Sequence, residues 1–288
     1  MDDSQRIPMV HRVGPGSQPL AEADQQLDYM TMPATMATYH QPAIPEPEEA
    51  GDIQPALALL QQVQQALAGF ATGGNAAFSL ADLNHDSREL INQILGVGEV
   101  SISVDGEAPM QIQESVMAGL WRVQQLGAEG RVVWDGVEVG AVPECVYQLA
   151  FAGARRQLDT QTPQLAVAVM NAPSLLVELA ERMALGPAAD GAAYVLNLTL
   201  LPLNDADLYC LGERLGVGPV TILSRGYGNC RIGSTACRDV WWIKYFNSED
   251  VLILNTIEVV AVPEVARAAP EDIEDSAHRL AEILEIYQ

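Results

Sequence analysis

Apolar residues recur three or four positions apart in several segments of the chain, which is the spacing of one face of an α-helix. Residues 55–68 carry this spacing in the first half, and residues 173–185 carry it in the second. A further helix is expected after each of Asn84 and Asn204, because asparagine is suited to cap a helix N-terminus. Pro270 opens a last amphipathic helix, whose predicted apolar face holds Ile273, Ala277, Leu280, Ile283 and Leu284.

Strands are predicted between these helices, where β-branched and aromatic residues gather and several segments alternate apolar with polar positions. They fall near residues 78–83, 99–104, 111–124 and 131–139 in the first half, and near 194–201, 219–224, 231–246 and 251–259 in the second.

The strongest pattern in the sequence is an internal repeat with a period of 120 residues. Residues 95–102 return as 215–222 with six identities in eight positions, and residues 137–144 return as 257–264, again with six. The predicted fold class is therefore α+β, with two tandem units of order α-β-α-β-β-β-α. Within each unit we expect a left-handed glycine (Gly96, Gly216) at a helix end and a proline (Pro143, Pro263) in the first turn of a closing helix.

Three regions follow from this pattern. Residues 1–52 are rich in proline, include an acidic run and show no periodic apolar face, so they are interpreted as a flexible arm. The arm is either a solvated tail or a segment that folds on a partner. Residues 53–152 form repeat unit 1, and residues 153–288 form repeat unit 2 with the C-terminal helix.

The charge of the chain excludes two classes of partner. Acidic residues outnumber basic ones by 38 to 15, and the net charge of −23 argues against nucleic acid and anionic membrane surfaces. No apolar run is long enough for a membrane span, and the acidic first residues lack the apolar core of a secretory leader. We expect a soluble cytoplasmic protein without membrane insertion.

The four cysteines are too few for a disulfide scaffold. Cys230 and Cys237 are separated by six residues, wider than the usual zinc pairs, and could ligate a metal only with two further ligands. The repeat places both opposite methionines, Met110 and Met117, which favours buried apolar thiols over a metal or redox role.

No nucleophile, acid/base or nucleotide motif is recognisable, so the sequence predicts neither an enzyme nor a bound cofactor. Glu138 and Glu258 recur at equivalent strand positions, and paired carboxylates can carry acid/base chemistry. Their place in alternating strands is explained more simply if both side chains face outward.

Two aromatic residues are candidates for contact with a partner. Tyr227 lies between two glycines in a predicted turn. Trp242 is opposite Arg122 in the repeat, a residue type that prefers exposure, whereas Trp241 is opposite Trp121 and is expected in the core. The alternative for Trp242 is that a helix or the other repeat covers it.

Several strings resemble the HupH/HyaF/HoxQ family of hydrogenase expression and formation proteins. They include Leu95-Gly96-Val97-Gly98-Glu99-Val100-Ser101, Gly119-Leu120-Trp121-Arg122-Val123, Gly226-Tyr227-Gly228, Val262-Pro263-Glu264-Val265 and the arm's Gly14-Pro15-Gly16-Ser17-Gln18-Pro19. The resemblance covers nearly the whole chain, in the family's order and spacing.

This resemblance implies an accessory protein, or chaperone, in the maturation of an uptake nickel–iron hydrogenase. The expected partner is the precursor of the iron–sulfur small subunit, bound in the cytoplasm before twin-arginine export, and other hydrogenase accessory proteins are further candidate partners. The resemblance transfers no catalytic residues. The alternative hypothesis is a metal or iron–sulfur carrier that uses Cys230 and Cys237.

Overall fold

The computed structural model describes residues 52–160, 168–225 and 229–287. Almost all of the predicted arm, residues 1–52, therefore lies outside the described residues.

Repeat 1 contains α1 (Gln54–Ala68), α2 (Phe70–Gly73), β1 (Ala76–Ser79), α3 (His85–Leu95), β2 (Val100–Val104), β3 (Met110–Glu114), β4 (Leu120–Leu126), η2 (Ala128–Gly130), β5 (Val132–Val139) and α4 (Glu144–Leu149). Repeat 2 contains α5 (Ala172–Leu185), β6 (Tyr194–Asn197), η3 (Leu198–Leu200), α6 (Asp205–Leu215), β7 (Val220–Ser224), β8 (Asn229–Ser234), β9 (Val240–Phe246), β10 (Leu252–Val259), η4 (Glu264–Ala266) and α7 (Pro270–Glu285).

The ten strands form one antiparallel sheet in the order β1-β5-β4-β3-β2-β7-β8-β9-β10-β6. The two repeats meet at the centre, where β2 pairs with its own equivalent, β7. Ile102 lies opposite Ile222, and Val100 and Val104 lie opposite Ser224 and Val220. Because the repeat period is 120 residues, this register relates the two units by a pseudo-twofold axis at the Ile102–Ile222 pair.

The α+β class and the duplication are present, but each unit has one strand more than the sequence analysis predicts. Residues 111–124 were expected as one strand and form two, β3 and β4, with a turn at Ser115–Gly119 between them. Residues 231–246 divide in the same way into β8 and β9. Each turn has only one residue of the type that favours a turn, Gly119 in the first and Asp239 in the second, both at positive φ. A single such residue is a weaker signal than the Asn-Gly or Asp-Gly pairs of a short hairpin, so the turns were not predicted.

Most helix boundaries follow the sequence. Asn84 and Asn204 cap α3 and α6, since their side-chain oxygens accept hydrogen bonds from the amides of Ser87 (2.8 Å) and Asp207 (2.9 Å). Pro143 and Pro263 stand one position earlier than expected, as the N-cap residues of α4 and η4.

Gly96 and Gly216 have positive φ angles of 56° and 67°, as expected at these helix ends. Their ψ angles, −157° and −173°, fall outside the left-handed helical region. This extended, positive-φ conformation is accessible essentially to glycine alone and turns the chain directly from the helix into the central strand.

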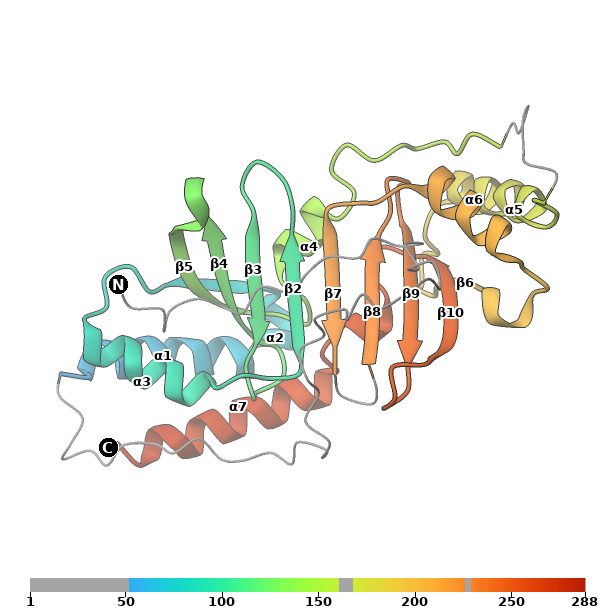
Figure 1. Ribbon diagram of the computed structural model, residues 1–288. Coiled ribbons are helices and arrows are strands. Elements are labelled where there is room, and N and C mark those ends of the chain that lie inside the picture. Colours follow the sequence, from blue (N-terminus) through green and yellow to red (C-terminus); the bar gives the residue numbers. More distant parts are fainter. Residues whose placement is uncertain (1–51, 161–167, 226–228, 288) are drawn as a thin grey trace.

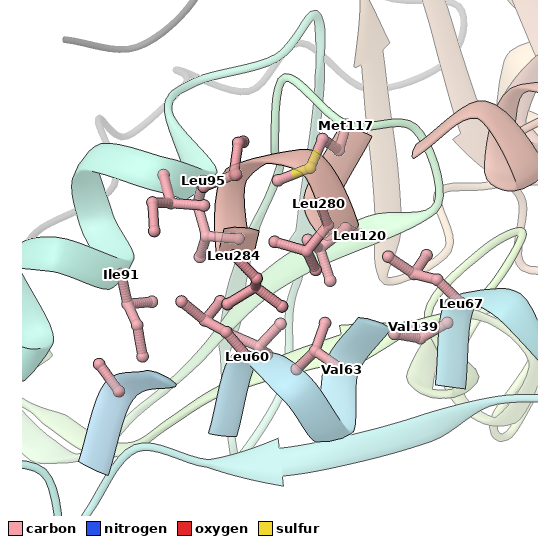
Figure 2. Packing of buried hydrophobic residues seen from close by; sticks show 14 of the residues in the cluster. Leu60, Val63, Leu67, Ile91, Leu95, Met117, Leu120, Val139, Leu280 and Leu284 are labelled. Carbon is pink, nitrogen blue, oxygen red and sulfur yellow. The ribbon is translucent and has the colours of Figure 1, made fainter. Parts of the chain in front are cut away.

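Helices α1, α3 and α7 at one end of the sheet, and α5 and α6 at the other, cover the same face (Figure 1). At the repeat 1 end, α1, α3 and α7 pack over β4 and β5 in a core drawn in Figure 2, in which Leu280 and Leu284 of α7 lie beside Leu60 and Val63 of α1. At the repeat 2 end, α5 and α6 pack over β9 and β10. Helix α7 is the last element of repeat 2 in the chain yet packs on repeat 1, so the sequence boundary at residue 153 does not separate two independent cores.

The opposite face of the sheet carries a third core that runs across both repeats. It centres on Ile102, Ile222, Trp121 and Trp241 and is covered by α4 and the segment 260–266. Both tryptophans donate from Nε1 to equivalent carbonyls, that of Gly140 at 2.8 Å and that of Val260 at 3.2 Å. The prediction that Trp241 belongs to the core is confirmed.

Candidate functional site

Between the two helical groups, the helix-covered face of the sheet is polar. We call this surface the central polar face and define it by the side chains of the four central strands β3, β2, β7 and β8 that point to the helix side. Neither apolar cluster beneath the helices includes a residue of these strands. The strand pairing places the following residues there: Gln111, Gln113, Ser101, Ser103, Thr221, Leu223, Arg231 and Gly233.

At the repeat 1 end, the central polar face is bounded by a closed ion-pair network around Asp135 of β5. The carboxylate of Asp135 accepts two hydrogen bonds from the guanidinium of Arg122, both at 2.5 Å. Arg88 lies 3.6 Å from the same carboxylate, and the amide of Gln124 donates to it at 3.3 Å. The cations at this end are therefore balanced by an acid from within the chain.

At the repeat 2 end, the equivalent positions have a different charge pattern. Asn255 replaces Asp135, Trp242 replaces Arg122, Lys244 replaces Gln124 and Arg231 replaces Gln111. The Nε1 of Trp242 donates to the side-chain oxygen of Asn255 at 2.6 Å. The ammonium of Lys244 lies 5.4 Å from the centre of the Trp242 ring, a cation–π contact.

Trp242 is only 2% exposed, so its ring does not lie on the surface. The argument for its exposure rested on Arg122, and the Arg122 side chain is itself only 13% exposed because Asp135 holds it. The expectation of an exposed Trp242 is therefore wrong, and the alternative, a covered ring, describes the structure. Tyr227, the other candidate, lies outside the described residues.

Cys230 and Cys237 are not brought together. Cys230 belongs to the core shared by both repeats, whereas Cys237 packs in the core beneath α5 and α6, on the other face of the sheet. Burial raises the pKa of the Cys230 thiol to about 12 and also raises that of Cys237. Neutral, separated thiols are poor metal ligands, so the geometry gives the carrier hypothesis no support. Within residues 52–160, 168–225 and 229–287, no group of three or more His, Cys, Asp or Glu side chains is arranged to hold a metal.

Glu138 does not face outward as the strand pattern suggested. Its carboxylate is buried and accepts hydrogen bonds from the Asn75 side chain (2.9 Å) and the Glu144 amide (2.7 Å), which begins α4. Glu258 is partly buried, and burial together with Glu264 raises its pKa. The two carboxylates lie on strands β5 and β10, which six other strands separate in the sheet, so they form no acid/base pair.

The helical layer of repeat 2 exposes large apolar side chains. Six of them, in α5, β6, η3, α6 and the segment before α5, are between 47% and 80% exposed: Met170, Val177, Leu185, Val195, Leu200 and Tyr209. In the equivalent part of repeat 1, residues 52–95, no described large apolar side chain is exposed to this extent. Where exposed apolar side chains adjoin one another, they mark a surface that binds other molecules.

Neither Lys244 nor Asp135 is among the candidate residues that the sequence pattern predicts. The repeat alignment could have identified both positions, because the 120-residue offset pairs Lys244 with Gln124 and Asn255 with Asp135. That comparison shows a charge change between the repeats, but only the strand register shows that these positions adjoin one another.

A tandem duplication of an α+β unit, joined in one antiparallel sheet, is the class of protein that these observations define. None of the helices in the described part of the chain is long and apolar enough to cross a bilayer.

The chain belongs to the family of HupH hydrogenase expression proteins. The family model described as "HupH hydrogenase expression protein, C-terminal conserved region" matches it twice, over residues 53–155 and 169–287. The two matches correspond to the two repeats.

Relatives of known name extend over nearly the whole chain. The hydrogenase expression/formation protein HupH of Rhodobacter capsulatus is 47% identical over 272 residues, covering 94% of each chain. HoxQ of Cupriavidus necator, with the same description, is 44% identical over 279 residues and 96% of each chain. The hydrogenase-1 operon protein HyaF of Escherichia coli is 32% identical over 277 residues, covering 95% of this chain and 94% of its own. Among solved structures, the hydrogenase expression protein HupH from Thiobacillus denitrificans is 34% identical, covers 40% of this chain and 93% of its own, and gives a TM-score of 0.34.

Proposed function

We propose that this chain is a non-enzymatic accessory protein in hydrogenase maturation and that it binds the precursor of the iron–sulfur small subunit in the cytoplasm, before twin-arginine export. The observation that carries the proposal is full-length similarity to proteins named for hydrogenase expression and formation. Beyond what those names say, the proposal adds a specific binding partner, the small-subunit precursor, and a specific step, the one before export.

The surface of repeat 2 supports a role in binding an immature subunit. An unassembled subunit exposes apolar area that its final partners later cover, and the exposed side chains on α5, β6, η3 and α6 offer a complementary surface. The equivalent layer of repeat 1 is covered by α7, so client contact is assigned to repeat 2.

The net charge supports the same client. A twin-arginine leader is basic, and a chain with a charge of −23 attracts it over distances beyond direct contact. Electrostatic attraction of this kind raises the association rate and is screened by salt. We therefore expect the association rate constant to fall as ionic strength rises, with a smaller change in the dissociation rate.

Co-purification of the full-length chain with the small-subunit precursor tests the proposal. The double variant Leu185→Ser plus Tyr209→Ser is expected to weaken the complex on the order of tenfold, because it removes two exposed apolar contacts. The matched control, Val133→Ser plus Tyr147→Ser, alters exposed apolar residues of repeat 1 and is expected to bind normally. Failure of the wild-type chain to bind the precursor, together with normal hydrogenase activity in a deletion strain, would refute the proposal.

A further inference from the structure

Helices α5 and α6 of repeat 2 carry apolar and acidic side chains on the side that faces away from their own core. Residues four positions apart lie on one side of a helix. On α5 the residues at this spacing are Val177, Glu181 and Leu185, and on α6 they are Asp205, Tyr209 and Glu213. We call these six residues the outer face. Val177, Leu185 and Tyr209 are 47%, 75% and 67% exposed, and the three carboxylates are exposed as well.

The outer face is separate from the core of repeat 2. Both helices bury a different stripe, which includes Leu175, Leu176, Leu179, Cys210 and Leu211. The two helices contact each other and lie side by side in Figure 1, so their outer sides belong to one layer. An amphipathic helix needs one apolar stripe to pack on its own domain, and the apolar residues of the outer face are additional to it.

Repeat 1 shows that the fold does not require such a surface. The Asn84 side chain donates to the carbonyl of Asp52, and that of Asn204 to the carbonyl of Ala168, both at 2.9 Å, so the chain enters α1 and α5 at corresponding points. In the resulting alignment, the positions equivalent to the outer face include no large apolar residue and one carboxylate: Gln61, Gln65, Gly69, His85, Glu89 and Gln93. The combination of exposed apolar and acidic side chains is therefore specific to repeat 2.

The charge of α5 and α6 indicates which partner fits. The two helices contain five acidic residues and two arginines. Arg182 stacks over the ring of Tyr194 at 4.0 Å, and Arg214 lies 3.2 Å from the carboxylate of Asp159, so both arginines interact within the chain. The six residues of the outer face include three carboxylates and no cation. Apolar side chains among carboxylates match a partner that presents apolar side chains among cations.

The charge of the chain disfavours two other occupants. Outside the described residues its cations are Arg6 and Arg12, and they belong to residues 1–51, which also contain eight acidic residues and are negative overall. Residues 161–167 and 226–228 are uncharged. A second copy of the chain, docked face to face, would place the same carboxylates against one another, and like charges in contact oppose association.

We propose that the outer face binds a segment of the client polypeptide in which arginine or lysine residues stand beside apolar residues. The apolar side chains of that segment cover Val177, Leu185 and Tyr209, and its cations pair with the three carboxylates. Arginine and lysine serve both purposes, because their methylene stems pack on apolar surface while their charged ends reach a carboxylate. This inference rests on the proposed function, since the client is the small-subunit precursor, and it adds the residues that hold the client and the chemistry of the segment they hold.

Charge reversal on the full-length chain tests the surface. Glu181→Lys plus Glu213→Lys is expected to weaken binding of the precursor on the order of tenfold, because two carboxylates that pair with its cations become cations themselves. Glu107→Lys plus Glu282→Lys changes the net charge by the same amount at exposed positions outside repeat 2's helical layer and should bind the precursor more tightly than the first variant. Both variants should melt within about 2 °C of the wild-type chain, since all four residues are exposed.

Photo-crosslinking tests the chemistry of the partner. Tyr209→p-benzoylphenylalanine in the full-length chain is expected to crosslink to a precursor peptide that contains arginine or lysine within about four residues of the attached apolar residue, one helical turn away. The same replacement at Tyr147, an exposed tyrosine of α4, is the control and should give no such product. Attachment to an acidic precursor peptide, to residues 6–12 of the same chain or to a second copy would overturn the proposal.

The outcomes separate this inference from the proposed function. If the wild-type chain binds the precursor and the two double variants bind it equally well, the outer face is refuted while the proposed function stands. A melting temperature lowered by about 5 °C or more in Glu181→Lys plus Glu213→Lys alone would show that a segment of this chain occupies the outer face, and would also refute the inference. If the wild-type chain does not bind the precursor, both proposals fall.

Discussion

At the scale of the residue, equivalent positions of the two repeats carry the same residue where a side chain would clash with the backbone. A Cβ atom on Gly98 would lie 2.1 Å from the carbonyl oxygen of Ser115, and one on Gly218 would lie 2.4 Å from the hydroxyl of Ser234. Both glycines therefore permit a close approach of two backbone segments. The residues that these glycines approach need not be identical in the two repeats, as Glu114 and Ser234 illustrate.

Ser234 and Glu114 take equivalent places beside the amides of Val220 and Val100. The Ser234 hydroxyl accepts a hydrogen bond from the Val220 amide at 2.9 Å, so an uncharged group satisfies this buried donor. Glu114 is a carboxyl in the same position, and burial together with the nearby charge of Glu99 raises its pKa to about 7, although the amides of Gly119 and Val100 oppose the rise.

Glu114 should make the stability of the fold depend on pH. Its folded pKa of about 7 exceeds the reference value of 4.5, so the folded state holds a proton that the unfolded state has released. Stability from this group is present below about pH 4.5 and is lost as the pH rises through about 7, by roughly 3 kcal/mol at most. Urea unfolding at pH 5 and pH 8 should show that Glu114→Gln removes this loss.

Glu107→Gln, in the exposed β2–β3 loop, is the control for that measurement and should keep the wild-type difference between the two pH values. An unchanged pH profile in Glu114→Gln would show that the carboxyl is solvated in the folded state.

At the scale of the element, helix α7 decides how the repeats depend on each other. Its sequence predicts a helix with an apolar face, and all five predicted face residues are buried. The sequence does not predict the partner, which is α1 of the other repeat, where Gln64 also donates to the carbonyl of Ala277 at 3.5 Å. Repeat unit 2 therefore contributes its last helix to the core of repeat unit 1.

Leu280→Ala should destabilise repeat 1 rather than repeat 2. Leu280 is fully buried against α1, and truncation leaves a cavity that costs about 2–5 kcal/mol. Hydrogen exchange of the backbone amides should accelerate first in α1 and α3, while α5 and α6 change less. Glu282→Ala, at an exposed position of the same helix, should leave exchange unchanged. Faster exchange confined to α5 and α6 would contradict the assignment of α7 to repeat 1.

At the scale of the whole molecule, the shared sheet and the core on its opposite face unite the repeats. The β2–β7 pair places the equivalent residues Ile102 and Ile222 side by side, and both belong to one apolar cluster with Trp121 and Trp241. Neither unit can lose its central strand without exposing the core of the other, which is the structural basis of cooperative unfolding.

We expect residues of both repeats to unfold in a single thermal transition. Ile222→Ala should lower its midpoint without splitting it, at a cost of about 2–4 kcal/mol, because the cavity forms in the core common to both units. Differential scanning calorimetry measures this directly, and Ile253→Ala, at an exposed position in β10, provides the control. Two separate transitions in either variant would show that the repeats unfold independently.

The sequence by itself determined the duplication, its period, the α+β class, the N-caps at Asn84 and Asn204, and the amphipathic character of the last helix. These features depend on local spacing, and local spacing survives in a linear string. The split of residues 111–124 into two strands was not predictable in this way, because its turn residues carry weak local signals.

Only the tertiary structure decided which equivalent residues meet. The burial of Trp242, the hydrogen bond from the first amide of α4 to Glu138, and the separation of Cys230 from Cys237 all depend on strand register and on which helix covers which end of the sheet. These are contacts between residues distant in the chain, and their energies depend on neighbours that no local pattern specifies.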